Sequence, residues 1–278
     1  MTIGEYLKKT FRASDANFIR SELSKLSKKI PDGMPNGEVY LQYLAGQHVL
    51  SMFAELKSPL QIMLQYYEGV YKAQEEYMPS FPPMSPLSSS YFAFWALTDF
   101  VFGQGKETIG TCFLDSIDNY GFPEEMNSSI KAMQSSRMGI YEHLGFSGKY
   151  IVLWELLTDR ECRCFNVSGY QGTRGEIWLA RLLPPILNAD NYFSIITPYV
   201  LMEATPIEWV HFLNRMLAVS GDSKEQALYD FMKYGRSVNY WNEFIFCSYV
   251  NFESDVIYLK GFPDIKSSLP HGRLLRDV

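Results

Sequence analysis

The first third of the chain carries apolar residues at helical spacing. Residues 15–30 place Ile and Leu side chains on one stripe, as in a helix with a single buried face. Two further helices are expected at about 38–57 and 59–77, because Ser58 suits a helix cap and Pro59 suits the first helical position. Residues 1–78 are therefore predicted to form an N-terminal helical unit.

A composition change follows this unit. Residues 79–90 hold four prolines and five serines, which predicts a linker or a long surface loop. Apolar residues then return at helical spacing over 91–102 and 109–120, and Pro123 begins a third helical pattern. The sequence thus predicts a set of central helices over 91–148.

The periodicity changes from helical to alternating at residue 149. Strand-like segments, separated by turn-forming residues at hairpin spacing, occupy 150–157, 161–167, 176–183 and 192–201. Strands at this spacing predict an antiparallel meander, and a meander of this size usually curls into a small β-barrel. We therefore expect a small β-barrel over 149–203.

Helical signals return after the barrel segment. Thr205-Pro206-Ile207-Glu208 combines a capping box with proline at the first helical position. Further helices are expected from Ser223 to Gly235 and over 237–250, followed by a short strand over 255–259 and a tail. The segment 204–278 completes an α+β fold, in which helices precede and follow a four-stranded antiparallel meander or small β-barrel.

The order of several motifs between residues 91 and 201 resembles that of a known family. The motifs are Phe94-Trp95-Ala96-Leu97-Thr98-Asp99-Phe100, Glu107-Thr108-Ile109, Gly139-Ile140-Tyr141-Glu142, Leu156-Leu157-Thr158-Asp159-Arg160-Glu161 and Gly175-Glu176-Ile177-Trp178-Leu179-Ala180-Arg181-Leu182. They resemble a group of uncharacterised bacterial proteins, some of which carry a zinc-binding SEC-C tail. The resemblance covers about two fifths of the chain and implies helices followed by a small barrel, without indicating an activity. No cysteine follows Cys247, so the zinc of the tailed members is not expected here.

Composition and charge restrict the class of protein. The 278 residues are 47% hydrophobic and carry a formal net charge of −6, which is typical of a globular chain and gives no basic footprint for nucleic acid. The sequence shows no export signal and no apolar run long enough to cross a bilayer. Four cysteines are too few for a disulfide framework in a chain of this length. We expect a soluble cytoplasmic protein that needs no cofactor and does not enter the membrane.

The glycine-rich loop 168–175 is the first candidate binding site. It superficially suggests a phosphate loop, but it lacks the lysine and the following helix that such a loop requires. Tyr170, Gln171 and Arg174 at its tip are candidate binding residues, because loop tips on rigid barrels are frequent recognition sites. Tyr240 and Trp241, in a polar and aromatic C-terminal run, are further candidate binding residues.

Catalytic chemistry has one candidate cluster. In a nuclease or hydrolase, Glu243 from a helix and Asp255 from a strand would hold Mg²⁺, and Lys260 would assist the attacking water. The position before Lys260 that a PD-(D/E)xK nuclease fills with Asp or Glu is Tyr258 here. Cys162 and Cys164 share one face of a strand but lack the further ligands of structural zinc, so no metal site is predicted.

The favoured function is that of a soluble bacterial interaction or regulatory protein without catalytic activity, which binds another protein or a second copy of itself. One alternative is a metal-dependent hydrolase or nuclease that uses the C-terminal acidic cluster. The other is a nucleic-acid-binding accessory protein, since small barrels often bind single strands. The balanced charge of segment 149–203 argues against nucleic acid as the partner.

Overall fold

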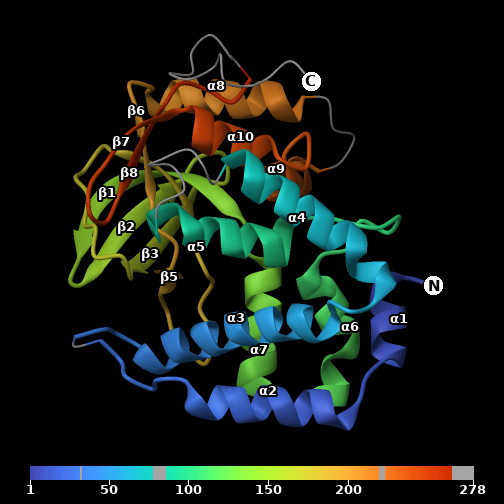
Figure 1. Cartoon of the computed structure of the whole chain (residues 1–278). Helices are drawn as coiled ribbons and strands as arrows, with labels where there is room; N and C mark the ends of the chain where they lie inside the picture. Colours follow the sequence, from blue (N-terminus) through green and yellow to red (C-terminus); the bar gives the residue numbers. More distant parts are fainter. Residues whose placement is uncertain (32, 78–85, 219–222, 265–278) are drawn as a thin grey trace. The chain divides into compact units, whose positions relative to one another are not determined.

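The computed structural model describes residues 1–31, 33–77, 86–218 and 223–264 (Figure 1). The chain forms two compact units, each assembled from separated stretches of sequence. Unit 1 comprises Met1–Gln74, Ala93–Ser135 and Pro184–Asp190, and unit 2 comprises Glu75–Phe92, Ser136–Leu183 and Asn191–Val278. Most of the expected linker 79–90 and the tail from residue 265 lie outside the described residues.

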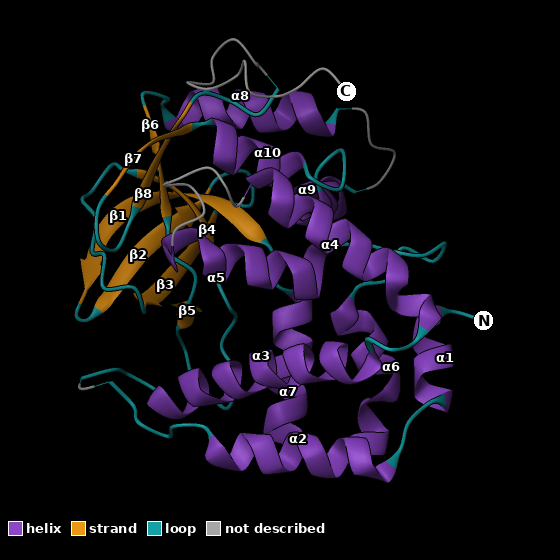
Figure 2. Cartoon of the chain, viewed as in Figure 1, coloured by secondary structure: helices purple, strands orange, loops and turns teal. Residues whose placement is uncertain are grey.

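Unit 1 is helical, as predicted for the N-terminal and central segments (Figure 2). The helix expected over 91–102 differs from this prediction. Its α-helical part ends at Phe94, the last residue of α5 (Pro86–Phe94), and one turn of π-helix follows over Trp95–Asp99. The elements of this unit are α1 (Ile3–Lys9), α2 (Ala13–Lys25), α3 (Gly37–Lys57), a short 3-10 turn (Gln61–Met63), most of α4 (Leu64–Tyr77), the π-helical turn, α6 (Ile109–Tyr120) and α7 (Glu124–Ser135).

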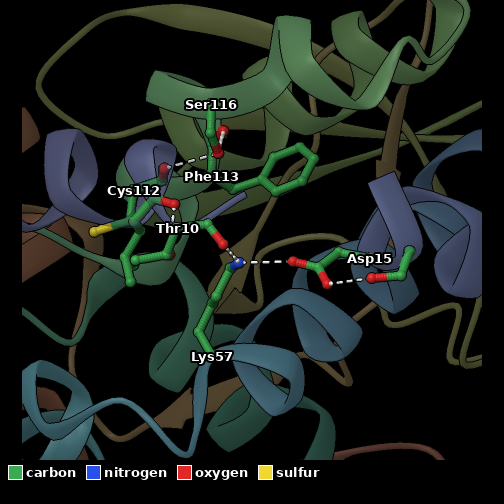
Figure 3. A network of polar contacts seen from close by, with 8 residues as sticks. Thr10, Asp15, Lys57, Cys112, Phe113 and Ser116 are labelled. Carbon is green, nitrogen blue, oxygen red and sulfur yellow. Dashed lines mark hydrogen bonds and ion pairs between the residues drawn. The ribbon is translucent and has the colours of Figure 1, made fainter. Parts of the chain in front are cut away.

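Close helix packing holds unit 1 together. Helix α3 crosses α7 at Gly46, where an added Cβ would lie 2.7 Å from the Met133 side chain, so the helices could not approach as closely with a larger residue. Helix α6 packs against α1 and α3, and Phe113 of α6 meets Phe53 of α3 edge to face. The side chain of Lys57 is buried near these apolar contacts and makes hydrogen-bonded and ionic contacts there (Figure 3).

Unit 2 is built on one mixed β-sheet. Its strand order is β5-β3-β2-β1-β4-β6-β8-β7. Two of the neighbouring pairs, β3 with β5 and β6 with β8, are parallel, and the others are antiparallel. The strands are β1 (Met138–Ser147), β2 (Tyr150–Glu155), β3 (Arg160–Asn166), β4 (Ile177–Arg181), β5 (Tyr192–Ser194), β6 (Tyr199–Met202), β7 (Tyr249–Phe252) and β8 (Ile257–Lys260).

The prediction of a four-stranded closed barrel was wrong. Among the described residues the sheet has eight strands and stays open, because its end strands, β5 and β7, do not pair with each other. Strand β1 occupies the end of the segment predicted to be helical, and β7 lies where the expected helix 237–250 was to end. The two parallel pairs also require crossover connections, which a meander does not contain. The mixed α+β class itself is confirmed.

Both faces of the sheet are buried where the central strands pair. One row of cross-strand partners runs over β1, β4, β6 and β8 and consists of Tyr141, Trp178, Val200 and Tyr258. The first three belong to a buried cluster, and Tyr258 packs against it. The neighbouring row of Ile140, Leu179, Tyr199 and Ile257 points to the opposite face, as side-chain alternation requires. Helix α5 reaches this second face, where Tyr91 contacts the Tyr199 ring edge to face.

Three C-terminal helices, α8 (Pro206–Leu217), α9 (Lys224–Tyr234) and α10 (Tyr240–Cys247), complete unit 2. The capping box at Thr205, the Ser223 cap and the end of α9 at Gly235 are confirmed. Aromatic contacts join the three helices, with Trp209 against Phe244 and Phe231 against Trp241. None of the helices in the described part of the chain is both long and apolar enough to span a membrane.

Candidate functional site

The glycine-rich loop 168–175, named the anchored loop below, is fastened to β1 by a buried histidine. The His143 side chain is fully buried, and its Nδ1 accepts the N–H of Gly145 at 3.1 Å. Because Nδ1 is an acceptor, the proton of the neutral ring lies on Nε2, which donates to the Gln171 carbonyl at 3.0 Å. The Gly175 N–H donates to the His143 carbonyl at 2.8 Å. One residue of β1 therefore holds the loop through both its side chain and its backbone.

A β-bulge places His143 in this position. The pairing of β1 with β2 shifts register between His143 and Gly145, so one extra residue is accommodated in β1. Gly145 has a φ of 119°, a conformation that side chains rarely allow. The Gly145 N–H, directly after the bulge, donates to the His143 imidazole, and this bond orients the ring.

The carboxylate of Glu176, at the end of the anchored loop, accepts hydrogen bonds from three neighbouring side chains. Glu176 accepts hydrogen bonds from the Tyr170 hydroxyl at 3.0 Å, the Thr173 hydroxyl at 2.8 Å and the Trp178 indole N–H at 2.9 Å. Burial raises the pKa of the Tyr170 hydroxyl, and its hydrogen bonds with Tyr258 and Glu176 raise it further. Tyr170 therefore stays protonated as a donor, and Glu176 is held by bonds from within and beside the loop.

The middle of the anchored loop is closely packed at Gly172. Gly172 has a φ of 66°, and an added Cβ there would lie 2.5 Å from the Trp178 ring and 2.8 Å from a Glu176 carboxylate oxygen. At the start of the loop, the Ser168 hydroxyl donates to the Asp255 carbonyl in the β7–β8 turn at 3.0 Å. The anchored loop thus has fixed contacts at its beginning, middle and end.

The solvent-facing side of the loop is a small surface that combines polar, charged and aromatic side chains. Gln171 and Arg174 are exposed, and Phe146, near the end of β1, is an exposed aromatic at 54%. The Phe146 ring meets His143 edge to face, with ring centres 5.2 Å apart. The Arg174 guanidinium makes no ion pair or hydrogen bond with any described residue. We call Phe146, Gln171 and Arg174 the loop-end surface.

A second polar cluster lies at the other end of β2. The Glu155 side chain is 1% exposed and accepts from Arg137 at 2.7 Å, Arg160 at 2.9 Å and Thr158 at 2.7 Å. Burial alone would raise the pKa of Glu155, but Arg137, Thr158 and Arg160 lower it below its ordinary value. The carboxylate is satisfied on both oxygens, so this cluster fixes the turn after β2 and offers no open group for chemistry.

The aromatic pair predicted as a binding surface lies mainly inside unit 2. Trp241 is 4% exposed, and its indole N–H donates to the Phe231 carbonyl at 2.9 Å. Tyr240 packs against both of these rings and is partly exposed. Both therefore join α10 to α9, and only Tyr240 reaches the surface.

The three candidate catalytic residues are not brought together. Asp255 lies in the β7–β8 turn, and Lys260 lies at the far end of β8, roughly 16 Å away at the rise of an extended strand. Lys260 pairs with Glu203 at 2.7 Å. Glu243 lies on α10, in a different element from either. Across the described ranges, no three His, Cys, Asp or Glu residues are arranged to hold a metal ion. Cys162 and Cys164 pack as free thiols in the buried cluster of the sheet.

Comparison of the chain with protein-family models, with curated proteins and with solved structures gives no match.

Proposed function

We propose that this chain is an interaction or regulatory protein that recognises a partner protein through the loop-end surface. The observation that carries the proposal is the contrast between the fixed base of the anchored loop and its open tip. His143 and Glu176 hold the base with side-chain hydrogen bonds, whereas Arg174 has no partner among the described residues.

The residue types at the tip suit protein recognition. Aromatic residues and arginine are enriched at the energetic centres of protein interfaces, where an anchor fills a pocket and water is excluded. A loop held in one conformation loses little conformational entropy when it binds, which favours affinity. In the complex we propose, Phe146 enters an apolar pocket of the partner while Arg174 pairs with a carboxylate at the rim.

The environment of the cysteines supports an intracellular setting. The cysteines of this chain are free thiols in buried positions, as expected in a reducing compartment. Together with the resemblance described above, this supports a bacterial cytoplasmic protein, and the partner can be another protein or a second copy of the chain. The separation of Asp255 from Lys260 gives no support to the hydrolase alternative.

The proposal is tested by photo-crosslinking in the host cell. A photoreactive phenylalanine analogue at Gln171 of the full chain should give one discrete adduct, whose mass distinguishes a different protein from a second copy. The same analogue at Val238, which is 45% exposed in the same unit, serves as the control. The adduct should disappear in Arg174→Glu. An adduct that forms equally at both positions, or that survives Arg174→Glu, would refute the proposal.

A further inference from the structure

Strands β1, β2 and β3, which lie side by side in Figure 2, carry a partly exposed patch on one face of the sheet. Leu153 of β2 pairs with His143, the residue that holds the anchored loop, and the next residue, Trp154, points to the opposite face. On that face Trp154 pairs with Glu142 of β1 and with Glu161 of β3. Trp154 and Glu142 are partly exposed, and Glu161 is exposed. Solvent therefore reaches an indole ring that has a glutamate on each side.

The two glutamates beside Trp154 take no part in holding the sheet together through their side chains. Their carboxylates make no hydrogen bond or ion pair with any described residue. Glu155, the next residue on β2, is different: it is buried on the other face, and two arginines satisfy its carboxylate. Directly paired residues on neighbouring strands have Cβ atoms about 5 Å apart, so both unpaired carboxylates can reach a group placed over the Trp154 ring.

An arginine of the chain itself shows what this face accommodates. Arg163 pairs with Val152, and its guanidinium lies over the Tyr150 ring, with 4.7 Å between Cζ and the ring centre. Tyr150 and Trp154 lie on opposite sides of Val152 along β2, so Arg163 leans away from Trp154. The Trp154 ring makes no aromatic or cation contact with any residue in the described ranges. The face thus has two aromatic positions, of which one holds a cation and the other is open.

We propose that Trp154 binds an arginine side chain of a partner protein, whose guanidinium stacks on the indole and pairs with Glu142 and Glu161. Indole is the side-chain ring that attracts cations most strongly. Arginine fits better than lysine, because its planar group stacks on a ring and still donates N–H groups from its edge. The aliphatic stem of the arginine would pack on Val152. The two unpaired carboxylates select this occupant over a neutral or acidic segment, since their charge complements a cation alone.

Titration of the full chain with a glycyl-arginyl-glycine peptide that has blocked ends tests this proposal. The indole N–H resonances report binding in NMR spectra, and the Trp154 resonance is the one that disappears in Trp154→Phe. This resonance should shift and saturate with the arginine peptide. The same peptide with citrulline, the neutral isostere of arginine, should bind about tenfold more weakly. Added salt should weaken binding of the arginine peptide, because it screens the exposed carboxylates.

Variants of the two glutamates separate their local role from net charge. Glu142→Gln and Glu161→Gln should each weaken binding of the arginine peptide about threefold. Glu225→Gln, which removes an exposed carboxylate from α9 in the same unit, should leave the affinity unchanged. An unshifted Trp154 resonance, equal affinity for both peptides, or equal effects of all three variants would overturn the proposal. A shift of the resonance with protein concentration alone would overturn it as well, because a second copy would then occupy the face.

Discussion

The substitution His143→Ala tests whether the anchored loop depends on its buried histidine. It removes the bonds to Gly145 and Gln171 at 3.1 and 3.0 Å, and it removes the ring contact with Trp178 at 5.5 Å between ring centres. Each hydrogen bond contributes about 1 kcal/mol, because water can reach the partly exposed Gly145 and the exposed Gln171 after the change. Burial of the ring contributes about 1 to 2 kcal/mol more. The expected loss of unfolding free energy is therefore about 3 kcal/mol.

Urea denaturation measures this loss as a lower midpoint with an unchanged slope. Hydrogen exchange should also show faster exchange within residues 169–175, since their attachment to β1 is weakened. His211→Ala is the matched control, because His211 is exposed on α8 and its removal should change stability by less than about 0.5 kcal/mol. A loss below about 1 kcal/mol for His143→Ala, or unchanged exchange in the loop, would refute the reasoning.

Four further substitutions test other parts of the same structure. Gly172→Ala should lower the free energy of unfolding in urea by about 2 kcal/mol or more, because the added Cβ meets the Trp178 ring. Gly175→Ala is its control: no atom lies within 4 Å of the added Cβ, so this change should cost only the strain of a positive φ, about 1 kcal/mol. Glu155→Gln should cost about 3 kcal/mol at pH 7, because it leaves two arginines without their buried carboxylate. Since the folded-state pKa of Glu155 is lowered, its stabilisation is present above the ordinary pKa of glutamate and is lost as the pH falls through the lowered value, so acid unfolding curves of wild type and variant should converge. Asp255→Ala should leave both stability and the melting temperature in Mg²⁺ unchanged within error, and Mg²⁺ stabilisation of the wild type alone would contradict the geometry.

Local sequence signals predicted the helix ends at Thr205, Ser223 and Gly235, but not the helix start expected at Ser58-Pro59, since Ser58 ends α3 and α4 begins at Leu64. The side chains of Thr205 and Ser223 accept the amides that their motifs require, and Gly235 ends α9 with a positive φ. The alternating burial of β2 and β3 also matches the pattern of their sequence. In these segments the information lies within a few residues, so no tertiary contact was needed to recognise them.

Strands that depend on distant partners were missed. Residues 138–147 follow α7 after only two intervening residues, with no proline or helix-ending glycine to mark the change, and their strand conformation comes from pairing with β2 and β4. The residues of β7 continue the aromatic pattern of α10, but they pair with β8. Without these strands the expected sheet was too small, and a small sheet suggested closure into a barrel.

Only part of the candidate site was predicted, because some of its residues also depend on distant partners. The tip residues Gln171 and Arg174 could be identified because turn-forming glycines mark a loop between strands. His143 could not, because its bond to Gln171 spans 28 residues and depends on the β1 bulge. Glu176 had a usable local signal: it lies two residues before Trp178 on one strand face and three after Thr173, and both donate to it.

Affinity for the partner identified by crosslinking is the most direct test of the loop-end surface. Dissociation constants should be measured for the purified full chain, for Phe146→Ser and Arg174→Glu, and for Arg236→Glu as an exposed arginine outside the surface. We predict at least tenfold weaker binding, about 1.4 kcal/mol, for each loop-end variant and less than a twofold change for the control. Equal affinities of all four proteins would contradict it.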